Sequence, residues 1–198
     1  MSRFIESIKL KDGVFYRLNF HQQRLNKAFE TFFPEAEPIR VYDSLIQLMI
    51  PAEGIFKCRM VYDTELIETE IIPYVRREIK SLRVVEMNIA SVPYKPEDRT
   101  SFNEAFAHRG NCDDVLIFRN GLLTDSSYSN VALYDGNDWF TPKTPLIYGV
   151  NRAELLQNGK LIEKGISITD LKQYQQIALF NAMIEFGEIV LDIDKVKM

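Results

Sequence analysis

The sequence predicts an α+β protein built from two lobes. Strand-like alternation and helical spacing of apolar residues both occur, so neither an all-helical nor an all-strand class fits. The second half lacks the regular strand–helix–strand rhythm of a doubly wound sheet. An extended, proline-marked crossing at Val92-Pro93-Tyr94 separates the halves. We therefore expect a small N-terminal lobe over residues 1–90 and a larger C-terminal lobe over residues 91–198.

The N-terminal lobe is predicted to begin with a β-hairpin. Phe4 to Leu10 alternates between apolar and polar residues, Asp12-Gly13 supplies a tight turn, and Val14 to Leu18 is the second predicted strand. Asn19 is the predicted N-cap of a helix over residues 21–32. The remaining predicted elements are a helix over 41–49, strands over 54–62 and 66–74 joined by a turn at 63–65, and a strand over 81–88.

The C-terminal lobe is predicted to mix short helices with short strands. A helix over residues 98–109 carries apolar Phe102, Ala105 and Phe106 on one face and stops at Gly110. The predicted strands cover 114–119, 122–123, 130–134, 139–140, 176–180 and 189–196. Further helices are expected over 151–156 and from 169, and residues 124–129 and 141–148 are expected to be a polar run and a proline-punctuated loop.

Composition argues against several function classes. The formal net charge of −4, with no Lys/Arg block, disfavours nucleic acid and anionic membranes as partners. No apolar run is long enough to span a bilayer and no signal core is present, so a cytoplasmic location is expected. Cys58 and Cys112 are too few for a disulfide framework and are expected to be buried thiols. His21 and His108 lack metal-ligand spacing, so no metal site is predicted.

Two basic side chains are candidates for binding or catalysis. Arg59 follows Lys57 by two residues on a predicted strand, so both share one face. This pattern fits a solvated strand face or a phosphate anchor, since a guanidinium can hold phosphate through two parallel hydrogen bonds. Lys95 follows an extended segment and precedes Pro96. It fits a surface lysine or an amine that forms a Schiff base.

Two later stretches complete the candidate set. Asp125 follows a predicted hairpin and fits a turn aspartate bound by backbone amides, or a carboxylate that keeps a pyridine nitrogen protonated. Gly149-Val150-Asn151 opens a predicted helix and fits an ordinary helix start or a phosphate-binding site. Together with Arg59 and Lys95, these stretches supply two phosphate contacts, one amine and one ring-nitrogen partner. A pyridoxal phosphate site requires these groups.

The chain resembles the class IV, or fold-type IV, pyridoxal phosphate enzymes. This family includes branched-chain and D-amino-acid aminotransferases and 4-amino-4-deoxychorismate lyase. The similar segments are, in chain order, ESIKLKDGVFYRLNFHQQRL, KCRMVYD, YKPEDR, DDVLIFRNGLLTDSSYSN and TPKTPLIYGVNR. The resemblance implies a two-lobed fold-type IV architecture in a shortened form, with pyridoxal 5'-phosphate as cofactor.

The resemblance also implies a role for each matching residue. Asp125 stands where the family usually has Glu, and its shorter arm is expected to reach the ring nitrogen. The family's hydroxyl-bearing C-terminal segment corresponds to residues 180–183. The implied cofactor contacts are Lys95 through the Schiff base, Arg59, Gly149, Val150 and Asn151 at the phosphate, Asp125 at the ring nitrogen, and Asn181 as a substitute phosphate ligand.

The implied activity is that of an enzyme acting on an amino-bearing substrate through a Lys95 aldimine. The short chain favours 4-amino-4-deoxychorismate lyase, which gives 4-aminobenzoate and pyruvate in folate biosynthesis. One alternative is an amino-acid aminotransferase of the branched-chain or D-amino-acid type. Another is a non-catalytic ligand-binding relative, which the shorter Asp125 would favour. The resemblance further implies a homodimer.

Overall fold

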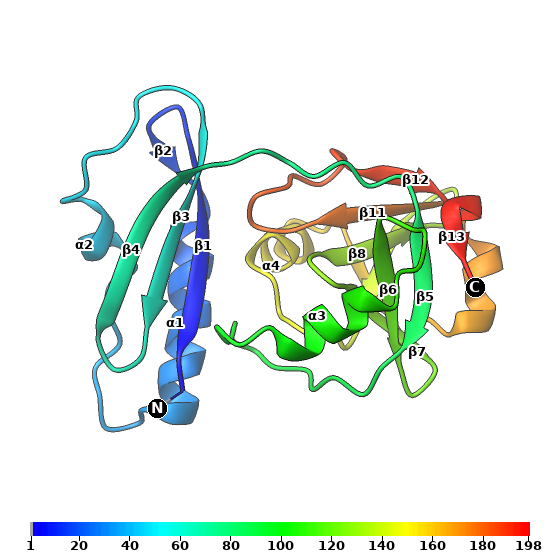
Figure 1. Cartoon of the computed structure of the whole chain (residues 1–198), viewed down its shortest axis with the longest axis horizontal. Coiled ribbons are helices and arrows are strands. Elements are labelled where there is room, and N and C mark those ends of the chain that lie inside the picture. The colour runs from blue at the N-terminus through cyan, green and yellow to red at the C-terminus, as the bar shows by residue number, and fades with distance from the viewer. Residues whose placement is uncertain (1) are drawn as a thin grey trace. The chain divides into compact units, whose positions relative to one another are not determined.

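The computed structural model describes residues 2–198, which form two compact units (Figure 1). Unit 1 contains the residues up to Arg76 together with Pro93–Asp98, and unit 2 contains Arg77–Val92 together with Arg99–Met198. Both units are therefore discontinuous in sequence, and the expected lobes over 1–90 and 91–198 stay a prediction. In the described part of the chain, no helix is long and apolar enough to cross a membrane.

Unit 1 is built on an antiparallel sheet with the strand order β2-β1-β3-β4. β1 (Phe4–Lys11) and β2 (Val14–Phe15) form the expected hairpin. Asp12 (φ 49°) and Gly13 (φ 77°) both have the left-handed backbone that a two-residue hairpin turn of this type requires. β3 (Ile55–Tyr62) pairs with β4 (Leu66–Pro73), as predicted.

The helix α1 (Leu18–Phe32) covers one face of this sheet (Figure 1). It begins earlier than predicted, because Arg17 (φ 58°) turns the chain into the helix and accepts a hydrogen bond from the His21 amide. Asn19 is therefore inside the first turn and is not the N-cap, and β2 ends at Phe15 rather than continuing to residue 18. The core between helix and sheet contains Phe4, Ile8, Leu25, Ala28, Phe29, Met60 and Tyr62.

Unit 2 contains two sheets, with the strand orders β10-β9-β8-β11-β12 and β13-β5-β6-β7. Parallel and antiparallel neighbours occur in both, which confirms the α+β class. Three predicted strands, over 114–119, 130–134 and 176–180, are confirmed at both ends. The strands are β5 (Leu82–Glu86), β6 (Asp114–Arg119), β7 (Leu122–Ser126), β8 (Asn130–Tyr134), β9 (Trp139–Pro142), β10 (Ile162–Lys164), β11 (Gln176–Phe180), β12 (Val190–Asp192) and β13 (Val196–Lys197).

Several predicted boundaries are wrong. β7 runs on through Asp125 and Ser126, because these polar residues pair with buried β6. The strand predicted over 189–196 is divided by a 3-10 turn, and the exposed strand β10 was not predicted. The helices are α2 (Val41–Leu45), α3 (Thr100–Ala107) and α4 (Val150–Gln157), with 3-10 turns η1 (Ile168–Gln173) and η2 (Ile193–Lys195), so α2 and α3 are shorter than expected. Cys58 is buried, as expected, but Cys112 is only partly buried; both are free thiols.

Candidate active site

One face of the unit 1 sheet carries the basic residues that the sequence singled out. Successive side chains of a strand point to opposite faces of the sheet. The neighbours of the residues that face α1 therefore point away from that helix. The opposite face is organised in rows by the strand register, and we call it the site face. Its rows are Ile5–Val61–Glu68, Ser7–Arg59–Glu70 and Lys9–Lys57–Ile72.

Lys95 lies against the site face because its segment pairs with the start of β1. Pro93 and Pro96 favour extended backbone around it. The Ile5 amide donates to the Lys95 carbonyl (2.9 Å), and the Glu97 amide donates to the Arg3 carbonyl (3.0 Å). The Lys95 ammonium then donates to the Ser7 hydroxyl, with Nζ and Oγ 3.2 Å apart. The structure thus brings Lys95 to the same row as Arg59.

Arg59 is held by three carboxylates within unit 1. Its Nη2 donates to Glu97 (2.8 Å), and its Nη1 donates to Glu68 (3.2 Å) and lies 3.8 Å from Glu70. The guanidinium is partly buried, whereas Glu68 and Glu70 are about half-exposed. A phosphate bound here would have to replace carboxylate contacts with its own.

A fully buried ionic cluster lies on the other face of the same sheet. Glu6 accepts hydrogen bonds from Arg24 (2.9 Å to Nε) and contacts His21 Nδ1 at 2.5 Å. Burial opposes ionisation of Glu6, but Arg24 and His21 outweigh it and lower the pKa of Glu6 to about 2. Burial lowers the pKa of His21, and together with the smaller effects of the Arg24 and Lys95 charges it outweighs Glu6, which raises this pKa. The cluster fixes β1 against α1. Because Ser7 follows Glu6 on β1, the cluster also fixes the position of Ser7 on the site face.

Sequence reasoning missed this cluster. His21 looked isolated because its partner is 15 positions away, and Arg24 is 18 positions from Glu6. One signal could have found it. Glu6 occupies the inward-facing position between apolar Phe4 and Ile8, and His21 and Arg24 are one helical turn apart.

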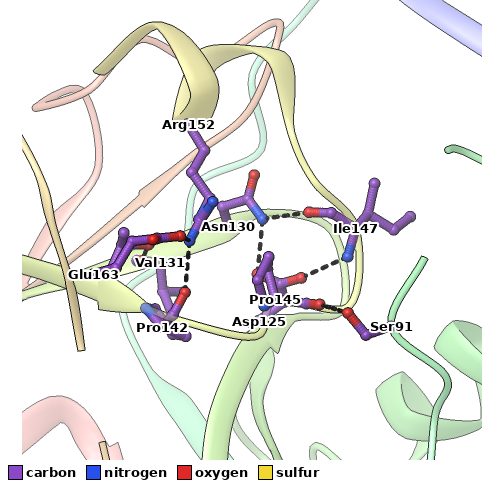
Figure 2. A network of polar contacts seen from close by, with 10 residues as sticks. Ser91, Asp125, Asn130, Val131, Pro142, Pro145, Ile147, Arg152 and Glu163 are labelled. Carbon is purple, nitrogen blue, oxygen red and sulfur yellow. Dashed lines mark hydrogen bonds and ion pairs between the residues drawn. The ribbon is translucent and has the colours of Figure 1, made fainter. Parts of the chain in front are cut away.

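In unit 2, Asp125 is buried within a loop-binding network (Figure 2). Its Oδ2 accepts hydrogen bonds from the amides of Leu146 (2.7 Å) and Ile147 (3.1 Å), and its Oδ1 accepts one from Asn130 Nδ2 (2.8 Å). Asn130 Nδ2 also donates to the Ile147 carbonyl (2.9 Å). These bonds match the turn-aspartate interpretation of Asp125. They also leave an acceptor site on Oδ1, since a carboxylate oxygen can accept two hydrogen bonds.

Burial raises the pKa of Asp125 to about 7, even though the bonds from Asn130, Ile147 and Leu146 favour the ionised form. Near neutral pH the carboxyl group is therefore close to half-ionised. A cationic N–H donor placed on it would favour the ionised form and lower this pKa. The chemistry expected of a ring-nitrogen partner is thus available to this side chain.

Gly149 precedes α4 and touches the same network. Its φ of −70° is ordinary, so no positive φ demands glycine here. The requirement is steric, because a Cβ on residue 149 would overlap Oδ1 of Asn130. Ala153 donates the first intrahelical bond to the Gly149 carbonyl, so the amides of Val150 and Asn151 precede the helical ladder. Such amides suit an anion.

Asn151 and Asn181 are joined by their hydrogen bonds. Asn151 Nδ2 donates to the carbonyls of Asn181 (2.9 Å) and Ile184 (3.1 Å), while its buried Oδ1 has no partner in the described residues. Asn181 Oδ1 accepts the amides of Met183 (2.8 Å) and Ile184 (3.0 Å). Its Nδ2 donates to the Tyr128 carbonyl (3.2 Å) and the Ser129 hydroxyl (3.2 Å). Both oxygen and nitrogen of the Asn181 amide are thus engaged in holding loops.

The loop over residues 141–148 is fastened at several points (Figure 2). The Ser91 hydroxyl donates to the Pro145 carbonyl. Buried Arg152 donates to the Pro142 carbonyl (2.7 Å) and to Glu163 (2.7 Å). Arg152 lies on α4, so the helix that follows Gly149 is tied to the loop that binds Asp125.

The predicted site residues fall into two groups. The structure brings Lys95 and Arg59 to one face of unit 1. In unit 2 it links Asp125 to Gly149 through Asn130, and Asn151 to Asn181. In residues 2–198, no group of three His, Cys, Asp or Glu side chains has an arrangement that could hold a metal ion.

Several known proteins are similar to this chain in sequence. Residues 102–190 match the family model described as amino-transferase class IV. An uncharacterised protein of Haemophilus influenzae is 31% identical over 186 residues, covering 92% of this chain and 98% of the relative. A candidate aminodeoxychorismate lyase of Schizosaccharomyces pombe is 34% identical over 103 residues, or 49% of this chain and 45% of that protein.

Solved structures show the same fold over nearly the whole chain. A candidate 4-amino-4-deoxychorismate lyase from Haemophilus somnus superimposes with a TM-score of 0.87 at 30% identity, covering 93% of this chain and 98% of that one. The branched-chain amino acid aminotransferase from Escherichia coli has a TM-score of 0.73 at 16% identity, covering 93% and 74%. These matches confirm the predicted fold-type IV architecture. The chain belongs to the class IV aminotransferase family, whose members are pyridoxal phosphate-dependent enzymes.

Proposed function

We propose that this class IV enzyme is a 4-amino-4-deoxychorismate lyase that uses pyridoxal 5'-phosphate and forms 4-aminobenzoate and pyruvate. The observation that carries the proposal is the Lys95 amine held by Ser7 in the same row as Arg59. The similarity to the candidate lyases of Haemophilus somnus and Schizosaccharomyces pombe supports this choice of substrate over an amino acid.

The donor groups of the chain fit this cofactor. Lys95 supplies an amine for the aldehyde, and Asp125 supplies a carboxylate for the ring nitrogen. Arg59 and the amides of Val150 and Asn151 are proposed to bind the phosphate. Gly149 leaves the start of α4 without a side chain, which suits close approach of an anion. When bound, pyridoxal phosphate supplies an aldehyde that condenses with amines and a ring that accepts electrons from the substrate carbon.

Lys95 is the proposed catalytic residue. It holds the cofactor in the resting enzyme, and as a released amine it moves a proton. In the lyase reaction it removes the proton from the ring carbon that bears the substrate amine. The C–O bond to the enolpyruvyl group then breaks, the ring becomes aromatic, and a proton returned to the leaving group gives pyruvate. The backbone bonds that fix its segment on β1 keep the amine in place for both transfers.

The other residues act by binding and charge. Asp125 is proposed to accept a hydrogen bond from the protonated ring nitrogen on Oδ1, where an acceptor site is available. Arg59 is proposed to exchange its carboxylate contacts for the phosphate. Asn181 stays a predicted phosphate ligand. Its amide already bonds Tyr128, Met183 and Ile184, so binding a phosphate would cost some of those bonds.

The experiment that tests the proposal compares wild-type protein with Lys95→Ala. Wild-type protein incubated with pyridoxal phosphate is expected to become yellow, and Lys95→Ala is expected to lose the visible band. With aminodeoxychorismate, wild type is expected to release pyruvate and 4-aminobenzoate in equal amounts, and the variant to release neither. The matched control is Lys27→Ala, an exposed lysine paired with Glu30 on α1, which is expected to behave as wild type.

A second assay separates the lyase from an aminotransferase. Wild-type protein is mixed with branched-chain amino acids or D-amino acids in the absence of a keto acid. Loss of the visible band through conversion to the amine form of the cofactor, without pyruvate release from aminodeoxychorismate, would overturn the lyase proposal in favour of transamination. Retention of the band with amino acids, together with pyruvate release, supports the lyase.

The proposal includes a homodimer acting in the cytoplasm, in folate biosynthesis. The free thiols of Cys58 and Cys112 support a reducing compartment. Sedimentation of the purified protein is expected to give twice the chain mass of 23.0 kDa. A monomer that retains full lyase activity would contradict this part of the proposal.

A further inference from the structure

We propose that Arg99 is a positioning residue, which holds the turn over residues 126–129 and through this turn the cofactor contacts of unit 2. This inference rests on the proposed function and assigns a further residue to the same site. The turn, which we call the 126–129 turn, is the stretch of chain between Asp125 and Asn130. Arg99 follows Lys95 by four residues and is the N-cap of α3.

The 126–129 turn is closed by its own hydrogen bonds. The Ser126 amide donates to the Ser129 carbonyl (2.9 Å). The Ser126 hydroxyl accepts hydrogen bonds from the amides of Tyr128 (3.3 Å) and Ser129 (2.9 Å). The turn therefore moves as one piece.

The residues on both sides of the turn belong to the candidate site. Asn130 Nδ2 donates to Asp125 Oδ1, so the turn closes a loop around the proposed ring-nitrogen partner. Asn181 Nδ2 donates to the Tyr128 carbonyl and to the Ser129 hydroxyl, so the predicted phosphate ligand is attached to the same turn. A contact that fixes the turn therefore fixes both of these cofactor contacts.

Arg99 contacts the turn in two ways. Its Nη2 donates to the Ser127 carbonyl (2.7 Å). Its guanidinium lies 5.1 Å from the centre of the Phe102 ring and 5.5 Å from that of Tyr128. A planar guanidinium can stack on aromatic rings and donate hydrogen bonds in its plane at the same time. Phe102 is buried on α3, so the guanidinium joins the start of this helix to the turn.

Ser127 is also held from β6. Its hydroxyl donates to Asp114 Oδ1 (2.5 Å), and the same oxygen accepts the Val115 amide (2.8 Å). Asp114 is fully buried, and burial raises its pKa. The carbonyl of Ser127 is thus bound by Arg99 and its hydroxyl by Asp114, and all these residues belong to unit 2.

The charge of Arg99 is not used in an ion pair within the described chain. Burial lowers the pKa of Arg99, and the charge of Asp114 opposes this shift. An apolar side chain would avoid the cost of burying a cation, but it could not donate to the Ser127 carbonyl. What the guanidinium contributes here is the geometry of the turn.

The test compares Arg99→Met with Arg109→Met. Arg109 lies at the other end of α3, 4.1 Å from the centre of the Phe106 ring, and donates to the Phe106 carbonyl (3.2 Å). It therefore makes the same kinds of contact away from the 126–129 turn. In cofactor-free protein, hydrogen exchange of the Ser126 and Ser129 amides is expected to be about tenfold faster in Arg99→Met and unchanged in Arg109→Met.

The second measurement is cofactor binding. The dissociation constant of pyridoxal phosphate is expected to rise about tenfold in Arg99→Met and to stay unchanged in Arg109→Met. At saturating cofactor, the KM for aminodeoxychorismate is expected to stay within about twofold of wild type while kcat falls. Arg99→Lys is expected to resemble Arg99→Met, because an ammonium lacks the planar stacking surface of a guanidinium.

A double-mutant cycle tests whether Arg99 acts through the turn. The effects of Arg99→Met and Ser127→Ala on exchange of the Ser129 amide are expected to be less than additive, because both loosen the same turn. If Arg99→Met does not fold, Ser127→Ala decides alone. Unchanged exchange and unchanged cofactor affinity in Ser127→Ala would then overturn the inference.

Other outcomes would also overturn it. Unchanged exchange or unchanged cofactor affinity in folded Arg99→Met would show that the turn does not depend on this residue, and equal effects in Arg109→Met would show a general loss of stability. A KM that rises in Arg99→Met and recovers in Arg99→Lys would assign Arg99 to a substrate carboxylate instead. Failure of wild-type protein to load pyridoxal phosphate would overturn the proposed function, while the exchange measurement would still test the role of Arg99 in the turn.

Discussion

The side-chain oxygen of Asn130 occupies the space into which a Cβ on residue 149 would project. Asn130 cannot move away freely, because its Nδ2 donates to both Asp125 and the Ile147 carbonyl. The identity of residue 149 is therefore coupled to the buried carboxylate of Asp125.

Gly149→Ala is expected to destabilise the protein by about 1–3 kcal/mol, because the new methyl group overpacks a bonded side chain. The measurement is urea unfolding of cofactor-free protein. Gly165→Ala is the control, since a Cβ there meets no heavy atom within 4 Å. In a double-mutant cycle, Asn130→Ala is expected to remove much of the penalty of Gly149→Ala. Additive effects would show that the clash is not the cause.

The stability of the cofactor-free protein is expected to fall as pH rises from about 4 to about 7. The pKa of Asp125 is raised by burial from 3.8 to about 7, so in this range the folded state binds a proton that the unfolded state has lost. The shift corresponds to at most about 4 kcal/mol, using 1.36 kcal/mol for each pKa unit.

The measurement is the free energy of unfolding at several pH values for wild type and Asp125→Asn. The variant is expected to lack the Asp125 part of this slope. Asp43→Asn, which changes an exposed carboxylate on α2, is expected to leave the slope intact. Equal slopes in wild type and Asp125→Asn would contradict the raised pKa.

Glu6→Gln is expected to destabilise the protein by about 3–5 kcal/mol, because it leaves Arg24 buried without its counter-charge. Glu30→Gln, which breaks the exposed pair with Lys27, is expected to cost less than about 0.5 kcal/mol. The pKa of Glu6 is lowered from 4.5 to about 2, so its contribution is present above pH 4.5 and is lost as pH falls towards 2. A loss of less than about 1 kcal/mol in Glu6→Gln would show that the cluster adds little stability.

Asn181→Ala is expected to destabilise unit 2 by about 1–3 kcal/mol, because the Met183 and Ile184 amides lose their acceptor. Asn181→Asp keeps that acceptor and is expected to lose less. Exposed Asn137 provides the control substitution, Asn137→Ala, with an effect within about 0.5 kcal/mol. A large loss of pyridoxal phosphate affinity in Asn181→Ala without a change in stability would instead support its role as a phosphate ligand.

Local sequence predicted the fold wherever turn residues mark the ends of the elements. Asp12-Gly13 and Asn120-Gly121 both end strands as expected, because these residues accept positive φ at low cost. The prediction failed at Arg17, because its positive φ cannot be predicted from an arginine in the sequence. It failed again at Asp125, where β7 continues through polar residues because their partners on β6 are buried.

The site residues could be selected from sequence, but not their contacts. Lys95 and Ser7 are separated by 88 positions, so no local pattern links them. The carboxylates on Arg59 come from β4 and from Glu97, and the pairing of strands decides which ones reach it. The steric reason for Gly149 depends on the rotamer of Asn130, which a sequence motif does not contain.

The return of residues 93–98 to unit 1 has a consequence for protein synthesis. Pro96 pairs with Phe4, and Tyr94 packs on the aromatic core beneath it. The nascent chain cannot complete unit 1 until residue 98 has left the ribosome, by which time all of β5 has already emerged. A gene fragment ending at residue 90 would leave that core uncovered, so expressing unit 1 alone requires grafting this segment back onto it.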